Sequence, residues 1–128
     1  MAAFMNRLEP QAYAALRIVA GFLFLWHGSQ KLLGLPIDPP PGLPVLIQYL
    51  AGSIELVGGL LVMLGLFTSW AAFIASGLMA AAYWMAHGLN HLLPLLNQGE
   101  LAALYCFVFL LIAARGSGIW SLDSLRGS

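Results

Sequence analysis

The sequence has few charged residues and a single cysteine, and each shortage excludes a class of protein. Only 8% of its 128 residues are Asp, Glu, Lys or Arg, against about a quarter in a soluble domain, so a soluble fold could not cover its surface with charge. Cys106 is the one cysteine, which excludes an internal disulfide and any site built from several cysteine ligands. With a net charge of zero and no basic run, no nucleic-acid partner is expected.

In place of charge, the sequence has long apolar runs. A bilayer core of about 30 Å needs about 20 mostly apolar residues per helix, and four segments reach or approach that length. These segments are residues 11–35, 43–67, 69–88 and 98–114. We therefore predict an all-α fold, a single domain over residues 1–128 that forms a bundle of four transmembrane helices in the lipid bilayer. A tight turn at Thr68 and Ser69 makes the second and third helices antiparallel neighbours.

The distribution of Arg and Lys predicts the orientation. Arg7, Arg115 and Arg126 fall on the side that the two termini share, whereas the two long connections on the other side have no Arg or Lys. Because an excess of positive charge marks the cytoplasmic side, both termini are expected in the cytoplasm. Lys31 is the exception, and its long side chain can reach outward to the interface. The N-terminal stretch lacks a small-residue cleavage site, so we expect the first helix to be retained.

Glu55 is the only ionisable residue of the second apolar segment and lies at its centre. A charge there costs about 2.5–3.5 kcal/mol and marks a candidate functional residue. Helical spacing puts Glu55 on a face with glycines, and the first segment has a matching face that carries Arg17. We predict that the two glycine faces pack together and that Glu55 pairs with Arg17. Two interpretations stay open, namely an ion pair that only fixes helix register, or a proton acceptor or ligand contact.

A second set of polar residues gathers near the predicted outer end of the bundle. Its members are His27, Lys31, Tyr83, His87, Asn90, His91, Asn97 and Glu100. His27 lies farther inside the membrane than the other histidines, for which interfacial solvation is the alternative interpretation. Glu100 also fits a capping box that Asn97 opens, and Tyr105 is assigned to an aromatic belt.

These observations define the candidate site. Glu55 and His27 are the candidates for catalysis, and the candidates for substrate binding are Arg17, Lys31, Tyr83, His87 and Glu100. A bis-histidine haem fits less well, because His27 and His87 differ in depth by about two helical turns. A His/Glu metal site lacks suitable ligand spacing apart from His87-x-x-x-His91, which Gly88 and Asn90 interrupt. We therefore predict no resident metal.

Four motifs follow one another along the chain. They are the Arg17, Gly21, Gly28 and Lys31 spacing of the first helix, the run ELVGGLLVMLGLFT (Glu55 to Thr68), the acidic Glu100 that opens the last helix, and the closing GSGIWSLD (Gly116 to Asp123). Together they resemble the DoxX family of small bacterial membrane proteins over nearly the whole chain. The resemblance implies four membrane helices in the inner membrane and a relation to subunits of quinol oxidases and thiosulfate:quinone oxidoreductases. It supplies no catalytic residue, and the PIDPPPG loop departs from the family pattern.

The leading hypothesis is an oxidoreductase component of the membrane that acts on a small lipophilic molecule, of which a quinone is the example. Glu55 and His27 would exchange protons with it, and Arg17 or Lys31 would hold developing negative charge. The sequence shows no redox cofactor motif of its own, so electrons would come from a soluble or membrane redox partner. The alternatives are an assembly or scaffold subunit and a transport module for protons or a small solute. A homo-oligomer stays open.

Overall fold

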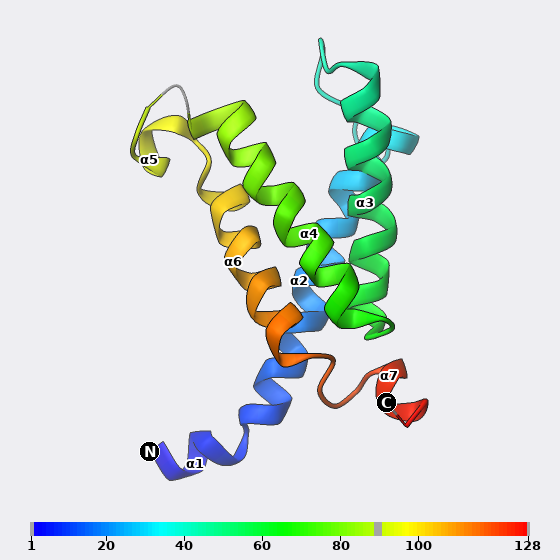
Figure 1. The fold of residues 1–128 in the computed structure, drawn as a ribbon, viewed down its shortest axis with the longest axis vertical. Coiled ribbons are helices and arrows are strands. Elements are labelled where there is room, and N and C mark those ends of the chain that lie inside the picture. The colour runs from blue at the N-terminus through cyan, green and yellow to red at the C-terminus, as the bar shows by residue number, and fades with distance from the viewer. Residues whose placement is uncertain (1, 89–90, 128) are drawn as a thin grey trace.

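The computed structural model describes residues 2–88 and 91–127, and this part of the chain is helical, with no strand. Four long helices form its body (Figure 1), namely α2 (Glu9–Leu33), α3 (Val45–Leu64), α4 (Thr68–Tyr83) and α6 (Glu100–Arg115). The short elements are α1 (Ala2–Arg7), α5 (Pro94–Asn97), α7 (Leu122–Leu125) and a π-helix turn, η1 (Trp84–Gly88), that extends α4. The all-α prediction is confirmed, and each predicted segment overlaps one long helix almost completely.

Two helices of the described chain are long and apolar enough to cross a membrane. They span Val45–Leu64 and Thr68–Gly88, the second including the π-helix turn. α6 has 16 residues, fewer than the about 20 that a crossing needs, and α2 carries Arg17 and Lys31. Length and composition therefore support two membrane-crossing helices, and the bundle of four crossings stays a prediction.

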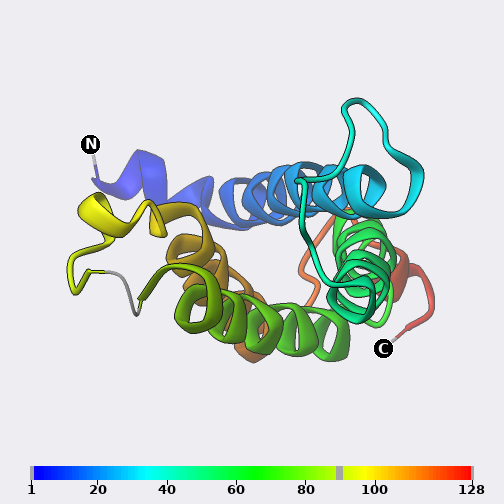
Figure 2. The same ribbon diagram turned by 90° about the horizontal axis from the view of Figure 1, so that it is seen from above.

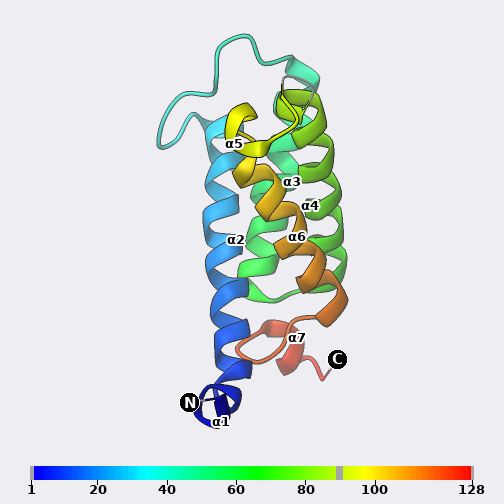
Figure 3. The same ribbon diagram turned by 90° about the vertical axis from the view of Figure 1, so that its left-hand side faces the viewer.

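The two ends of the chain lie at the same end of the molecule, where α1 and α7 are found (Figures 1 and 3). The opposite end carries α5 and the Pro-rich connection between α2 and α3, which projects away from the helices (Figure 2). α3 and α4 are antiparallel neighbours, as predicted. The turn itself precedes Thr68 and uses left-handed backbone at Gly65 (φ 72°) and Phe67 (φ 50°).

α2 and α3 pack face to face through glycines. A Cβ atom placed on Gly28 would lie 2.3 Å from the backbone nitrogen of Leu56, and one on Gly21 would lie 2.5 Å from that of Met63. Gly59 of α3 meets Leu25 of α2 in the same way, at 2.8 Å. Because only glycine allows backbones to approach so closely, the predicted packing of the two glycine faces is confirmed.

α4 and α6 form the second helix pair, and aromatic rings fill the space between the pairs. Ala72 and Ala75 of α4 are fully buried, which lets α6 approach. The Phe24 ring of α2 lies 4.6 Å from the Phe109 ring and 5.2 Å from the Tyr105 ring of α6, measured between centroids. Large apolar side chains also cover the outside of the helices, for example Trp70, Leu46 and Phe107. An apolar exterior of this kind marks a membrane or partner surface.

Candidate functional site

A cavity of about 300 Å³ lies between the two helix pairs, toward the end that carries α5. It is lined by Phe24 and His27 of α2, Glu55 of α3, Met79 and Ala82 of α4, His87 of η1, Gln98, and Leu101, Ala102 and Tyr105 of α6. Residues predicted from the sequence as catalytic, Glu55 and His27, thus share one cavity with His87. The lining is mostly apolar with a few polar groups, which is the usual composition of a small-molecule site.

Glu55 reaches this cavity as one half of an ion pair. Its Oε1 atom accepts a hydrogen bond from the Nζ atom of Lys31 at 2.7 Å, and the two side chains are 5% and 16% exposed. Gln48 donates to the Lys31 carbonyl at 2.8 Å, which adds a polar contact between α2 and α3 beside the pair. A buried carboxylate needs such a partner, because an unpaired charge away from water is costly.

The prediction that Arg17 pairs with Glu55 is wrong. Gly28 packs against Leu56, so the neighbouring Glu55 lies level with the part of α2 next to Lys31. Arg17 lies about four helical turns from Lys31, toward the N-terminus of α2. The predicted depths were measured from the helix ends, whereas the close glycine contacts set the actual register.

His27 lies beside Tyr105 in the lining of the cavity. Their ring centroids are 6.0 Å apart and the rings are nearly perpendicular, at 86°. Tyr105 is also stacked on Phe109, with centroids 5.6 Å apart, which fixes its ring. Within residues 2–88 and 91–127, neither the His27 ring nor the Tyr105 hydroxyl has a hydrogen-bond partner. Both groups are therefore available to a molecule in the cavity.

Tyr83 and His87 are joined through Asn97, which is 5% exposed. The Asn97 amide nitrogen donates to the Tyr83 hydroxyl at 3.0 Å and to the His91 carbonyl at 2.9 Å. Its side-chain oxygen accepts from the Gly99 N–H at 2.8 Å, and its backbone carbonyl lies 3.0 Å from Nδ1 of His87. His87 lines the cavity, whereas Tyr83 is not among the lining residues and is bound to Asn97.

The remaining predicted residues of the outer end do not meet at the cavity. Glu100 is exposed and begins α6 directly, after the N-cap residue Gly99. The predicted capping box is therefore wrong, because Asn97 belongs to α5 and its side chain is bound to the loop. His91 is exposed, and Asn90 lies outside the described residues.

Arg17 serves a different purpose at the other end of the bundle. It is fully buried, and its Nε atom donates to the Val62 carbonyl at the end of α3, at 3.1 Å. Its terminal nitrogens donate to the carbonyls of Ser117, Ile119 and Trp120, at 2.9 Å for Ile119 and 2.6 Å for Trp120. Arg17 thus holds the C-terminal segment against α2 and α3 and contacts no residue of the cavity lining.

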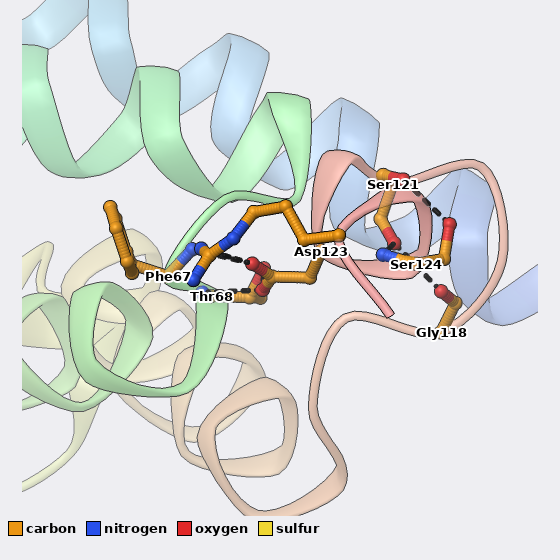
Figure 4. Close-up of polar contacts among 7 residues, drawn as sticks. Phe67, Thr68, Gly118, Ser121, Asp123 and Ser124 are labelled. Carbon is orange, nitrogen blue, oxygen red and sulfur yellow. Dashed lines mark hydrogen bonds and ion pairs between the residues drawn. The ribbon is translucent and has the colours of Figure 1, made fainter. Parts of the chain in front are cut away.

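Asp123 completes the attachment of the C-terminal segment (Figure 4). Its carboxylate accepts hydrogen bonds from the N–H of Phe67 at 3.0 Å, and from the N–H and hydroxyl of Thr68 at 3.2 and 3.1 Å. A carboxylate in this position satisfies free N–H groups at the start of α4 and complements its dipole. Ser121 caps α7 in the same region by accepting from the Ser124 N–H at 3.2 Å.

A larger hollow, of about 490 Å³, lies beside the C-terminal segment. Its charged side chains are already paired with one another or with neighbours, since Arg126 contacts Asp123 at 3.3 Å and Arg115 contacts Glu9. Arg115 also lies 4.5 Å from the centre of the Tyr13 ring. These polar groups hold the chain together, so the cavity between the helix pairs is the better candidate site. Within the described ranges, no three residues of the types His, Cys, Asp and Glu lie close enough together to bind a metal ion.

Three residues that line or support the cavity were missed or misassigned by the sequence analysis. Tyr105 was assigned to the membrane interface, although its position inside the last predicted helix, four residues before Phe109, was a signal that it faces the core. Asn97 was interpreted as a cap, and it supports the site from outside the lining. Gln98 lies in a loop whose course no periodic pattern predicts.

Comparison with known proteins places this architecture in a family. The DoxX family model matches residues 12–88. An uncharacterized protein of Haemophilus influenzae is 44% identical over 131 residues, covering 94% of this chain and 96% of that protein. The putative oxidoreductase CatD of Bacillus subtilis is 35% identical over 68 residues, covering 50% of this chain and 51% of CatD. No solved structure matches. The chain belongs to the DoxX family of membrane-associated proteins.

Proposed function

We propose that this protein binds a small lipophilic redox molecule of the quinone class in the cavity, as the membrane component of an oxidoreductase. The observation that carries the proposal is the convergence of Glu55, His27 and Tyr105 on one largely apolar cavity. Ligand sites begin at about 300 Å³ and combine apolar walls with a few polar groups. A cavity of about 300 Å³ therefore suits the ring of a quinone headgroup, whose tail would stay in the lipid.

The polar groups of the cavity match the proton requirement of this chemistry. Reduction of a quinone to a quinol takes up two electrons and two protons, and the reverse reaction releases them. Glu55 and His27 exchange the protons with the two oxygens, and the Tyr105 hydroxyl donates a hydrogen bond to one of them. Lys31 balances the charge of Glu55 across the 2.7 Å contact. The electrons come from a redox partner protein, since the sequence carries no redox cofactor motif.

The packing of the helices supports four membrane crossings. α2 lies along α3, and α6 lies along α4 (Figures 1 and 3), so the partners of the two most apolar helices occupy the same depth as those helices. The positions of Arg7, Arg115 and Arg126 favour both termini in the cytoplasm of a bacterial cell. The name of the Bacillus subtilis relative supports the oxidoreductase assignment.

An assembly subunit is the second candidate function. The observation that favours it is the Lys31–Glu55 contact itself. The two residues satisfy each other's charge, so the pair is able to hold α2 and α3 in register without binding any ligand. A transport module is less well supported. Three apolar side chains fill the interior between the cavity and the end that carries the termini, namely Val62, Phe109 and Ile112, which are 0% exposed. They leave no polar path for a solute through this part of the described chain.

Binding of ubiquinol-1, the reduced form of a short-chain quinone, to protein in mild detergent tests the proposal, because its hydroxyl groups can donate hydrogen bonds to Glu55 and His27. We expect the wild-type protein to bind it, and Glu55→Gln and His27→Gln to bind at least about tenfold more weakly, which corresponds to one lost hydrogen bond to a charged or polar group. Tyr49→Phe alters an exposed tyrosine of α3 and should leave binding unchanged. Mass spectrometry of co-purifying small molecules identifies the natural ligand.

A double variant separates the two candidate functions. Lys31→Met combined with Glu55→Met replaces the ion pair by apolar side chains of similar length, which buried pairs usually tolerate. If the cavity is a redox site, the double variant stays folded and loses ubiquinol-1 binding. A folded double variant that binds like the wild type would overturn the proposal in favour of an assembly role, as would a wild-type protein that binds no ubiquinol-1.

A further inference from the structure

The contact between His87 and Asn97 determines where the imidazole of His87 carries its proton. The partner of Nδ1 is a backbone carbonyl oxygen at 3.0 Å, which accepts hydrogen bonds and cannot donate them. Nδ1 must therefore carry a hydrogen. In the neutral ring, the other nitrogen, Nε2, is then an acceptor. Because His87 lines the cavity, a bound molecule meets a histidine of defined tautomer.

Two irregular stretches of backbone bring His87 and Asn97 together. His87 belongs to the π-helix turn Trp84–Gly88, and such turns occur often at functional sites. Gln98, which also lines the cavity, has φ 60°, a left-handed conformation that is unfavourable for a residue other than glycine. The bond from the Gly99 N–H to the Asn97 side chain spans Gln98 and holds it there. Strain kept in place beside a cavity is typical of ligand sites.

The hydrogen bonds of the Asn97 side chain hold the backbone turn at Gln98 in its conformation. Its amide nitrogen is bound to the Tyr83 hydroxyl on α4 and to the His91 carbonyl in the loop. Its oxygen is bound to Gly99, the residue before α6. Asn97 therefore fixes the loop to the helices on either side of it, and the direction of its own carbonyl follows from that attachment.

We propose that Asn97 is a positioning residue of the cavity, which keeps His87 as the Nδ1–H tautomer and so supplies Nε2 as an acceptor for a hydroxyl group of the bound molecule. The existence of that molecule rests on the proposed function, whereas the tautomer is a property of the chain alone. His87 thus offers an acceptor in addition to the proton-exchanging Glu55 and His27, and it comes from a different element.

The tautomer can be measured by ¹⁵N NMR on protein labelled at histidine, in detergent micelles at mildly alkaline pH. His27→Gln and His91→Gln identify the His87 signals by elimination. We expect the wild-type spectrum to show His87 protonated at Nδ1. In Asn97→Ala, the His87 signals should move toward the Nε2–H form. Tyr49→Phe alters an exposed tyrosine of α3 that is not part of these bonds, so it should retain the wild-type tautomer.

A rescue variant distinguishes positioning from general loss of structure. Glycine adopts positive φ without steric cost, so Gln98→Gly should keep the turn without help from the Asn97 side chain. Asn97→Ala combined with Gln98→Gly is therefore expected to restore much of the Nδ1–H signal. A wild-type His87 protonated at Nε2, or an unchanged tautomer in folded Asn97→Ala, would overturn the proposal. The wild-type spectrum alone provides this test where Asn97→Ala does not fold.

Binding of ubiquinol-1, the reduced form of ubiquinone-1, connects the tautomer to the ligand, because its ring hydroxyl groups can donate a hydrogen bond to Nε2 of His87. We expect binding to weaken about tenfold in Asn97→Ala, the loss of one hydrogen bond, and to recover in the double variant with Gln98→Gly. Binding that stays at the wild-type level while the tautomer changes would show that His87 does not contact the ligand and would overturn its role as acceptor. A wild-type protein with the Nδ1–H tautomer and no binding would overturn the proposed function while supporting the positioning role of Asn97.

Discussion

Three charged residues show three ways in which this chain accommodates a buried ion. Glu55 has a cation from the neighbouring helix, Arg17 has backbone carbonyls, and Asp123 has N–H groups at the start of a helix. Only the first arrangement borders the cavity between the helix pairs. Arg17 and Asp123 hold the C-terminal segment in place, and although Asp123 borders the hollow beside that segment, its carboxylate is already bound by Phe67 and Thr68.

Asp123 makes stability depend on pH. Burial raises the pKa of its carboxyl, but the hydrogen bonds from Thr68 and Phe67 and the charge of Arg126 outweigh burial, so the pKa lies below its ordinary value. The unfolded chain has a pKa of about 3.9 at this position. Because the folded pKa is lower, the ionised carboxylate stabilises the fold above about pH 3.9, and this contribution is lost as the pH falls through the folded value.

We therefore expect wild-type protein to melt at a higher temperature than Asp123→Asn at neutral pH, with a difference that shrinks as the pH falls below about 4. Circular dichroism of detergent-solubilised protein measures both melting curves. Asp38→Asn changes an exposed carboxylate in the Pro-rich loop and should leave the melting temperature unchanged at every pH. A wild-type advantage that stayed constant down to strongly acidic pH would contradict this account.

The sequence was sufficient to single out Glu55 as a candidate residue, which the structure places at the wall of a cavity, but not to predict its partner. The cost of an isolated carboxylate in an apolar run is a property of the residue and its neighbours in sequence. Its pairing with Lys31 depends on how far α2 slides along α3, which the glycine contacts decide. Asn97 illustrates the same limit, because its role depends on a loop and on Tyr83 from another helix.

At the scale of the elements, the contact between α2 and α3 leaves little room for any added side-chain volume. We expect Gly28→Ala to destabilise the protein by about 1–3 kcal/mol, the usual cost of forcing extra volume into a packed contact. The added Cβ would lie 2.3 Å from the Leu56 nitrogen, so the two helices must separate. Unfolding in a graded detergent mixture, followed by circular dichroism, measures the change.

Gly58→Ala provides the matched control. Gly58 lies on α3 as well, but a Cβ there would meet nothing within 4 Å. Replacing it should leave stability unchanged or raise it by up to about 1 kcal/mol, because alanine favours helix more than glycine does. Equal destabilisation by the two substitutions would mean that the close contact at Gly28 does not set the helix spacing.

The helices themselves were predictable because their apolar runs are long and their boundaries carry strong signals. PIDPPPG cannot be helical, so the end of α2 and the start of α3 followed directly. The π-helix turn and the short α5 were not predicted, since both depend on contacts with Asn97 and neither has a periodic pattern. The elements that the sequence left unpredicted are therefore the ones that shape the outer wall of the cavity.

At the scale of the whole molecule, the fold has two chemically different ends. The end with the termini is closed by Arg17, Asp123 and the C-terminal segment. The end with α5 and the Pro-rich loop lies near the cavity and exposes large apolar side chains, among them Leu92 and Leu95. With both termini in the cytoplasm, as proposed above, a lipophilic ligand would reach the cavity from the outer part of the bilayer.

Cysteine labelling in intact cells tests the orientation on which that conclusion depends. In a Cys106→Ser background, Asp38→Cys puts a thiol in the Pro-rich loop and Leu125→Cys, at a position that is 82% exposed, puts one near the C-terminus. With both termini in the cytoplasm, a membrane-impermeant maleimide should label position 38 in intact cells and position 125 only after the cells are disrupted. The reverse pattern would place the cavity toward the cytoplasm, and labelling of both positions in intact cells would exclude a bundle whose two ends lie on opposite sides of the membrane.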